Sequence, residues 1–335
     1  MNKLKILSLL LASLILLSSC GNNGPFEYNL LGEFDSDNLL NKYDDLNVTD
    51  KKTFTIAYPA PQKNNPLTLP EMIPQSLTDK LEKRLNNQTF CCAMYYLDLE
   101  TGFTITYNSD RLFGAASLIK APYLYFIFDR ISKGELSLDK VFTYKKSIHY
   151  FGGTGTVNKL PDGSKLTLRQ IIEHIFYESD NSAFRMLYNG TDGIMTLMDF
   201  HSKAVKEFDA PFLSGTYGSV LNASGVAKIF TKVYERSKTE ELFAWYIDLM
   251  KHANENKFVR GGLPVDENSE CIYEVAHKYG MDIKSSNDAA IVFYEDRPYI
   301  LIILTDYLGI NTESFMNRIS SDVYAIHQYI TAKNN

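Results

Sequence analysis

The spacing of apolar positions predicts a mixed chain that begins with a helix and two short strands. Leucines recur every four residues over 76–87, which is typical of one face of a helix. Two β-rich runs at 91–98 and 103–108 follow, and the Thr-Gly pair between them favours a hairpin. A strongly apolar helix is then expected from Ser117 through Ile131.

The middle of the chain has helical periodicity, and its last third returns to strands. Apolar residues on one helical face lie between Leu168 and Phe176, and Asn222 is the expected N-cap of a later helix. The strand pattern then reappears three times before a final amphipathic helix, over 272–279, 289–294 and 299–305.

This order of elements predicts an α+β fold with three layers. The early and late strands are expected to share one mostly antiparallel, five-stranded sheet. The terminal helices would cover one face of that sheet, and the helical middle would form a subdomain on the other face.

The N-terminal residues carry the pattern of an export signal. Lys3 and Lys5 precede an apolar run over 6–17, which is too short to span a bilayer comfortably. Small residues then lead to Cys20, and this arrangement resembles the lipobox of bacterial lipoproteins. The resemblance implies that residues 1–19 are a signal peptide, and that lipid on Cys20 anchors the exported protein to a membrane, facing the cell exterior or the periplasm. An ordinary signal cleaved nearby and an uncleaved anchor are the alternatives.

Residues 20–69 are rich in Asn, Asp, Gly and Pro, which favours a tether. Some local order is expected around 54–58. The folded domain is expected to cover residues 70–333.

Composition narrows the partners and cofactors. The chain has 335 residues, of which 45% are hydrophobic, and a formal net charge of −6. Without a basic stripe to release phosphate counterions, nucleic acid is not an expected partner. The six histidines are scattered and none has zinc-site spacing, so we expect no metal and no other cofactor. We also expect a monomer.

Three cysteines would remain besides Cys20. We expect Cys91, Cys92 and Cys271 to be unpaired and buried, and a bridge from Cys91 or Cys92 to Cys271 is the alternative.

Three short motifs hold the candidate chemistry. The first is Ser117-Leu118-Ile119-Lys120, in which the lysine lies one helical turn after the serine. A serine hydroxyl is a poor nucleophile until a neighbour takes its proton. Burial and a second nearby cation would lower the pKa of Lys120, so that its neutral amine can act as that base.

The second motif is Ser179-Asp180-Asn181, in a turn after a helix. Ser179 is expected to relay a proton to a leaving amine. Asn181 is expected to bind a substrate amide and to orient Lys120, while Asp180 points away and holds the turn.

The third motif, Lys278-Tyr279-Gly280, ends a strand. Lys278 is expected to hold a substrate carboxylate and to lower the pKa of Lys120. Gly280 would leave room for a substrate backbone close to the strand. The backbone N–H of Met281 could pair with that of Ser117 as an oxyanion hole.

These motifs, in this order, resemble those of class A β-lactamases in the serine β-lactamase and penicillin-binding protein superfamily. Two flanking stretches, Gly153-Thr154-Gly155 and Leu166-Thr167-Leu168, agree with the resemblance. It covers about residues 70–333. It implies the fold described above and a serine hydrolase that forms an acyl-enzyme at Ser117. The substrate would be a β-lactam, a peptidoglycan-like peptide or a related amide or ester.

Two departures from the family pattern bear on turnover. The E-x-x-L-N segment that supplies the deacylating glutamate is missing, and Glu207 and Asp209 are the weak candidates to replace it. Tyr279 stands where the family has Thr or Ser, so its phenol either contributes from farther away or blocks the site. Hydrolysis is therefore expected to be slow. The alternatives are a penicillin-binding or sensing lipoprotein, a D-Ala-D-Ala-type peptidase with little turnover, and a lipoprotein that keeps the fold alone.

Overall fold

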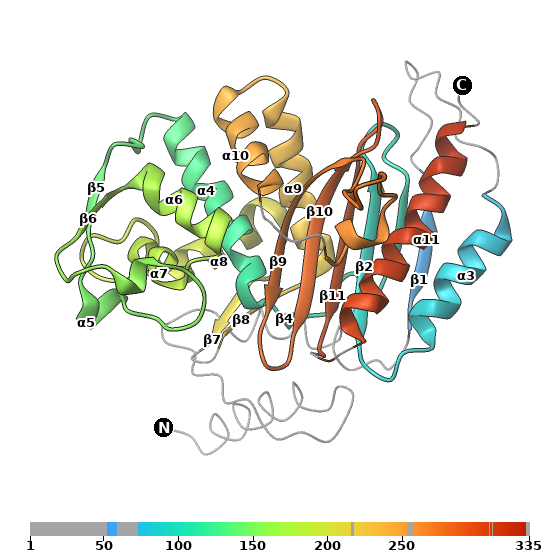
Figure 1. The fold of residues 1–335 in the computed structure, drawn as a ribbon, viewed down its shortest axis with the longest axis horizontal. Coiled ribbons are helices and arrows are strands. Elements are labelled where there is room, and N and C mark those ends of the chain that lie inside the picture. The colour runs from blue at the N-terminus through green and yellow to red at the C-terminus, as the bar shows by residue number, and fades with distance from the viewer. Residues whose placement is uncertain are drawn as a thin grey trace.

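A six-stranded antiparallel sheet forms the centre of the molecule, with the strand order β1-β3-β2-β11-β10-β9 (Figure 1). The computed structural model describes residues 52–58, 73–215, 218–252, 257–307, 309 and 311–332. The strands of the sheet are β1 (Phe54–Ala57), β2 (Cys92–Asp98), β3 (Thr104–Tyr107), β9 (Glu274–Met281), β10 (Ser286–Phe293) and β11 (Tyr299–Thr305).

The predicted fold class is confirmed, with one strand more than expected. The extra strand, β1, comes from the stretch predicted to be a tether and pairs with β3 at one edge of the sheet. It is only four residues long and alternates between half-buried and exposed positions. A run of four residues beside prolines gives little β signal in the sequence. Its pairing with β3 is what makes it a strand.

Two terminal helices cover one face of the sheet. These are α3 (Gln75–Asn86) and α11 (Thr312–Ala332), which lie side by side in Figure 1. The other face packs against α9 (Ala223–Ser237) and α10 (Glu241–Lys251), and α4 (Lys120–Ser132) packs against these two helices. This is the predicted three-layer arrangement.

Strand β11 shows how one sheet serves two cores. All seven of its residues are buried. Ile300, Ile302 and Leu304 belong to the core on the α9 side, and the residues between them belong to the core under α11. Strand alternation places neighbouring side chains on opposite faces, and burying each large apolar side chain contributes about 1.5–3 kcal/mol.

The helical subdomain lies at the β9 end of the sheet (Figure 1). Its other helices are α5 (Lys146–His149), α6 (Leu168–Glu178), α7 (Asn181–Tyr188) and α8 (Leu197–Phe208). Its small strands are β4 (Phe113–Gly114), β5 (Val141–Thr143), β6 (Lys165–Thr167), β7 (Leu213–Gly215) and β8 (Gly218–Leu221). Three short 3-10 turns complete the described chain, η1 (Ala116–Ile119), η2 (Val157–Lys159) and η3 (Arg260–Gly262).

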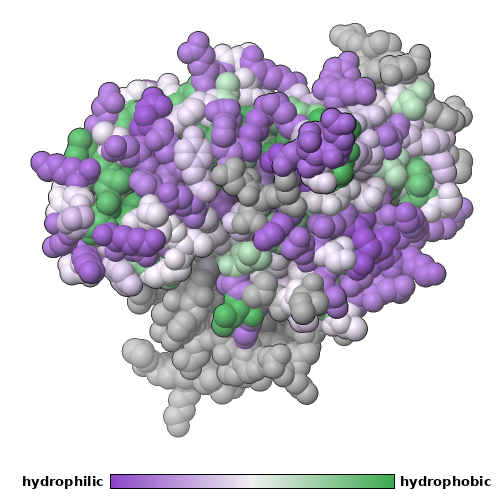
Figure 2. All heavy atoms as spheres, viewed as in Figure 1, coloured by the Kyte–Doolittle hydropathy of each residue, from purple (hydrophilic) through white to green (hydrophobic). Residues whose placement is uncertain are grey.

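Helix starts in the subdomain follow from capping side chains. Thr167 and Gln170 form a reciprocal capping box at α6. Asn222 caps α9, as predicted, by accepting a hydrogen bond from the backbone N–H of Gly225 at 2.9 Å. The outer surface seen in Figure 2 is mostly hydrophilic, with apolar side chains gathered at its left, over the subdomain.

Two predictions about the chain's ends and thiols have different outcomes. The signal peptide, Cys20 and most of the tether lie outside the described residues, and no helix among the described residues is long and apolar enough to cross a membrane. Cys92 is free and buried, as predicted, and Cys271 is free but only partly buried. The alternative of a bridge from Cys91 or Cys92 to Cys271 is therefore wrong, because sequence spacing does not tell which sulfurs meet in space.

Candidate active site

Ser117 lies in a tight turn between a small sheet and a buried helix. Strand β4 pairs with β8, and η1 leads directly into α4, whose first residue is Lys120. The predicted α-helix thus begins three residues later than expected, after a 3-10 turn. Ala116, just before Ser117, has a left-handed φ of 45°. That conformation costs a non-glycine residue about 1–2 kcal/mol and is typical of active sites.

Lys120 gathers the polar groups of two motifs around one amine. Its side chain is 2% exposed. The Nζ atom lies 3.0 Å from Ser117 Oγ and 3.2 Å from Ser179 Oγ. It also contacts Asn181 Oδ1 at 2.7 Å and the backbone oxygen of Ser179 at 2.5 Å. The predicted spacing therefore brings nucleophile, amine and the second motif together.

Burial is the largest cause that lowers the pKa of Lys120 well below its ordinary value. The nearby Lys278 ammonium lowers it further, and the Asp180 carboxylate opposes both effects. A neutral amine has two N–H donors and one lone pair. Two donors match the Ser179 carbonyl and Asn181 Oδ1, which leaves the lone pair to accept the Ser117 hydroxyl proton. This is the arrangement a general base needs.

Asp180 holds the second motif in shape. One of its oxygens accepts the backbone N–H groups of Thr156 at 2.6 Å and Val157 at 2.8 Å. The other accepts the N–H of Ala183 at 2.8 Å and so caps α7. Ser179 takes a left-handed φ of 52° just before it. Gly155 is required beside this carboxylate, because an added Cβ would lie 2.1 Å from Asp180 atoms.

The loop Gly153-Thr154-Gly155, which resembles the family, also holds the turn that carries Ser179. The Thr154 hydroxyl donates to the Ser179 carbonyl at 2.7 Å, and its own backbone oxygen accepts the N–H of Asn181 at 3.2 Å. The Asn181 amide nitrogen donates to the Gly152 oxygen at 2.9 Å, which directs its Oδ1 toward Lys120. Sequence reasoning marked Gly153 to Gly155 only as a family likeness and missed this role.

Strand β9 is an edge of the sheet, next to η1. Lys278 is 1% exposed, and its Nζ donates to the Tyr279 carbonyl at 2.7 Å. Burial lowers the pKa of Lys278 to about 8, and the Asp288 carboxylate counteracts that effect. Lys278 is thus mostly an ammonium at neutral pH.

Gly280 is required for packing within the chain, and its predicted role in leaving room for a substrate stays a prediction. A Cβ there would lie 2.4 Å from the backbone nitrogen of Leu118 and 2.8 Å from that of Ser117. The close approach that requires a glycine here is therefore between β9 and η1. Gly280 lets the edge strand reach the turn that carries the nucleophile.

The backbone N–H of Met281 points out of the free edge of β9. Asp282 donates its N–H to the Ser285 carbonyl at 3.0 Å, so Asp282 faces β10. Backbone groups alternate in direction along a strand. The N–H of Met281 therefore faces away from β10, toward the side on which η1 lies.

The side chain of Tyr279 packs away from the nucleophile. Its ring lies 5.5 Å from that of Phe258 and belongs to the core under α11. Lys278 Nζ is 4.7 Å from the ring centroid, within reach of a cation–π contact. The phenol ring therefore packs with the core under α11, whereas the turn that carries Ser117 packs with the core on the other face of the sheet.

Asn287 is a positioning residue that sequence reasoning missed. This buried side chain donates to the backbone oxygens of Gly114 at 2.7 Å and Ala115 at 3.3 Å, and accepts the N–H of Thr305 at 3.1 Å. It fixes the segment before Ser117 against β10. The available signal was an asparagine inside an otherwise apolar strand, since a buried amide needs partners.

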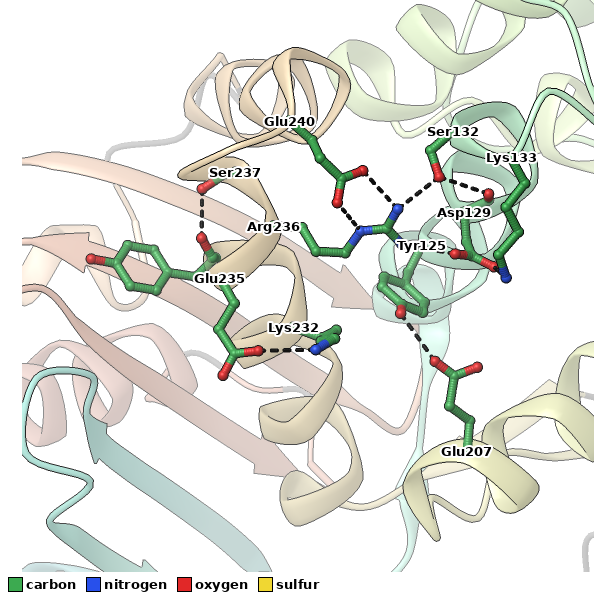
Figure 3. A network of polar contacts seen from close by, with 11 residues as sticks. Tyr125, Asp129, Ser132, Lys133, Glu207, Lys232, Glu235, Arg236, Ser237 and Glu240 are labelled. Carbon is green, nitrogen blue, oxygen red and sulfur yellow. Dashed lines mark hydrogen bonds and ion pairs between the residues drawn. The ribbon is translucent and has the colours of Figure 1, made fainter. Parts of the chain in front are cut away.

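Glu207 and Asp209 are not brought to Lys120. Glu207 accepts the Tyr125 hydroxyl at 3.1 Å and belongs to a network around the C-terminal half of α4, whereas Lys120 begins that helix (Figure 3). Asp209 is an exposed C-cap of α8. The carboxylate that acts on the pKa of Lys120 is Asp180, whose oxygens already accept backbone N–H groups. Among the described residues we find no free carboxylate poised to activate a water beside Ser117.

Three side chains near the second motif are of types that can bind a metal ion. His174, Glu178 and Asp180 have donor atoms within 4.8 Å of one another. Glu178 accepts the Thr156 hydroxyl at 2.6 Å, and Asp180 is occupied as described. The oxygens are thus engaged in holding the loop.

A family model decides the identity of the chain. The model described as the beta-lactamase enzyme family matches residues 76–327. The chain belongs to the beta-lactamase enzyme family. Beta-lactamase VEB-1 from Pseudomonas aeruginosa is 23% identical over 294 residues, which cover 82% of this chain and 92% of VEB-1.

Solved structures of other proteins share the fold. PBP-A superimposes with a TM-score of 0.69 at 19% identity, covering 78% of this beta-lactamase family chain and 100% of PBP-A. A point mutant of PBP-A, solved as an acyl-enzyme complex with penicillin G, superimposes with a TM-score of 0.68 at 18% identity. The match covers 78% of this chain and 99% of the mutant. These likenesses establish the fold and say nothing by themselves about activity.

Proposed function

We propose that the protein is a serine hydrolase that forms an acyl-enzyme at Ser117 with β-lactams or related amides and esters. The observation that carries this proposal is the 3.0 Å contact between Lys120 Nζ and Ser117 Oγ, made by a buried amine of lowered pKa. Membership of the beta-lactamase family supports a hydrolase.

In this proposal the neutral Lys120 amine takes the proton of Ser117 as its Oγ attacks the substrate carbonyl. The backbone N–H groups of Ser117 and Met281 stabilise the oxyanion that forms. Ser179 passes a proton to the leaving amine when the tetrahedral intermediate collapses. The product of this half-reaction is an ester on Ser117.

Substrate recognition is assigned to three further groups. The Lys278 ammonium binds a substrate carboxylate, and Asn181 binds a substrate amide. Tyr279 and Gly280 form the strand edge along which the substrate lies. β-Lactams are favoured because VEB-1 is a beta-lactamase and the PBP-A mutant is an acyl-enzyme complex with penicillin G.

Release of the acyl group is expected to be slow. Glu207 contacts Tyr125 and Asp180 is saturated with backbone N–H groups, so no described carboxylate is available to activate water. This observation favours a second candidate, in which the protein is a penicillin-binding or sensing protein, or a D-Ala-D-Ala-type peptidase, with little turnover.

Labelling with a fluorescent penicillin tests acylation, and a chromogenic cephalosporin tests turnover. We expect the full-length chain to be labelled, the Ser117→Ala variant to remain unlabelled, and cephalosporin turnover to be slow. Equal labelling of Ser117→Ala would overturn the assignment of the nucleophile. Fast steady-state hydrolysis would overturn the second candidate.

We further propose that the protein is exported and anchored by lipid on Cys20. The support is the basic, apolar and small-residue sequence ahead of that cysteine. A membrane anchor would keep the site near substrates of the cell envelope.

A further inference from the structure

Tyr279 is a motif residue whose side chain takes no step in the acyl transfer described above. It stands where the family has Thr or Ser, and its ring packs in the core under α11. The Lys278 ammonium lies against this residue, with Nζ 4.7 Å from the ring centroid and 2.7 Å from the Tyr279 carbonyl oxygen. Two contacts of a buried cation therefore come from the residue that departs from the family pattern.

These contacts are made at the free edge of β9. The N–H of Asp282 faces β10, so the backbone groups of Tyr279, three residues earlier, face the opposite way. The Tyr279 carbonyl thus points out of the sheet edge, on the same side as the N–H of Met281. No strand of the described sheet lies beyond β9 on that side, so Lys278 Nζ reaches both the carbonyl and the ring.

The same part of β9 adjoins the turn that carries the nucleophile. Residues 278 and 280 share one face of the strand, because strand side chains alternate. An added Cβ at Gly280 would lie 2.4 Å from the backbone nitrogen of Leu118, so this face lies against η1. The Lys278 side chain therefore leaves the strand beside the turn of Ser117. The Tyr279 ring contacts its Nζ from the other face of the strand.

Neighbouring elements hold the Tyr279 ring in place. The ring lies 5.5 Å from that of Phe258, a buried residue with a left-handed φ of 58°. The next residue, Val259, donates its N–H to Asp288 Oδ2 at 3.1 Å, and its carbonyl accepts the Ser320 hydroxyl at 2.6 Å. Both of these partners are buried. Contacts from β10 and α11 thus fix the segment against which the Tyr279 ring packs.

An aromatic face suits this ammonium for a physical reason. The face of the ring is the negative part of its quadrupole, and it attracts a cation more strongly where water is excluded. Lys278 is almost completely buried. An ammonium has three N–H donors, and the Tyr279 carbonyl accepts one of them. The ring stabilises the charge without a lone pair, so donors remain for a substrate carboxylate.

We propose that the ring of Tyr279 is the positioning group that holds the Lys278 ammonium at the free edge of β9 for a substrate carboxylate. Tyr279 then acts through Lys278, by its aromatic face and not by a hydroxyl. The inference rests on the proposed function, because it assigns the Lys278 ammonium to the substrate. Tyrosine at this position therefore neither blocks the site nor supplies its phenol to the substrate.

Acylation by a penicillin and by its methyl ester tests this role in the full-length chain. The ester lacks the carboxylate charge, so the ratio of the two acylation rate constants measures what the Lys278 ammonium contributes. Tyr279→Leu should lower this ratio by about 2- to 30-fold, because it removes the aromatic face. Tyr279→Phe should keep most of it. An equal ratio in wild type and Tyr279→Leu, or a ratio in Tyr279→Phe as low as that in Tyr279→Leu, would overturn the proposal.

Phe293→Leu is the matched control. The Phe293 ring also contacts a lysine, with Lys251 Nζ 4.6 Å from its centroid, and Phe293 pairs with Glu274 at the other end of β9. The variant removes an aromatic ring from the same sheet and should leave the ratio unchanged. A fall as large as that in Tyr279→Leu would assign the effect to lost aromatic packing and overturn the proposal.

NMR of the Lys278 side chain separates this proposal from the proposed function. The protons on Cε, next to Nζ, should be shifted upfield by the ring current in wild type and Tyr279→Phe, and the shift should be lost in Tyr279→Leu. Lys278→Arg assigns the signal. A wild type that shows this shift but is never acylated would overturn acyl transfer and leave the contact between ring and ammonium standing. No upfield shift in the folded wild type would overturn the positioning role of Tyr279.

Discussion

At Lys120, the chemistry depends on one amine being neutral while its neighbour Lys278 is charged. Burial and, after it, the Lys278 ammonium lower the pKa of Lys120 well below its ordinary value, and burial lowers the pKa of Lys278 to about 8. The proposed function uses Lys120 as the neutral base and Lys278 as the cation within one site.

Replacing Lys120 should remove the base without disturbing the nucleophile. We expect Lys120→Ala to slow penicillin acylation by about 10²–10⁴-fold. Lys120→Arg should fail similarly, because a guanidinium does not deprotonate in proteins. In the wild type, the acylation rate should rise with pH through the pKa of Lys120, well below the 10.5 of an ordinary lysine. Stopped-flow labelling checks this, and an acid limb centred near 10.5 would contradict it.

At the scale of elements, the site depends on the approach of η1 to the edge strand β9. Gly280→Ala should disrupt that approach, because its Cβ would overlap backbone atoms of Ser117 and Leu118. We expect a loss of about 1–3 kcal/mol in the free energy of unfolding, as for other overpacked sites, together with much slower acylation. Gly152→Ala is the control, since nothing lies within 4 Å of its added Cβ. Chemical denaturation and penicillin labelling of both variants check the prediction. Equal behaviour of the two would contradict it.

The far end of α4 is fixed by a separate polar network (Figure 3). Arg236 forms ion pairs with Asp129 at 2.8 Å and Glu240 at 2.7 Å, and its side chain is only 15% exposed. Arg236→Met should cost about 1–3 kcal/mol in stability, because it leaves Glu240 without this partner and Asp129 with Lys133 alone. Acylation by the folded protein should change little. Lys232→Met removes an exposed pair with Glu235 and should cost less than about 1 kcal/mol. Thermal denaturation that ranked the two in the opposite order would refute this.

The sequence predicted elements where periodicity is strong and missed those that depend on contacts. Residues 299–305 were predicted as a strand and form β11, because the run is continuously apolar. At β1 the sequence predicted only some local order around 54–58, since its pairing with β3 is what makes it a strand. Likewise, the order of the three motifs was enough to predict that Ser117 and Lys120 belong to the site. The roles of Thr154 and Asn287 could not be predicted, because each is a single polar residue whose hydrogen-bond partner is far away in the sequence.

For the whole molecule, the proposed anchor predicts where the protein is found. Cys20→Ser should shift the full-length protein from the membrane fraction to the soluble fraction, since lipid cannot be attached to serine. Cys92→Ser is a suitable control, because Cys92 is a free, buried thiol inside the domain. Fractionation of cells expressing each variant tests this. Unchanged membrane association of Cys20→Ser would contradict lipidation at that residue.

The balance between acylation and release distinguishes an efficient hydrolase from a slow one. The nucleophile and its base are in contact, whereas the described residues offer no free carboxylate for deacylation. The protein should therefore react quickly with a penicillin and then hold the acyl group.

Time-resolved intact-mass spectrometry of the full-length chain with penicillin tests this most directly. We predict one covalent adduct that forms rapidly on the wild type, is absent from Ser117→Ala, and persists long after free penicillin is removed. No adduct on the wild type, or an equal adduct on Ser117→Ala, would contradict acyl transfer at Ser117.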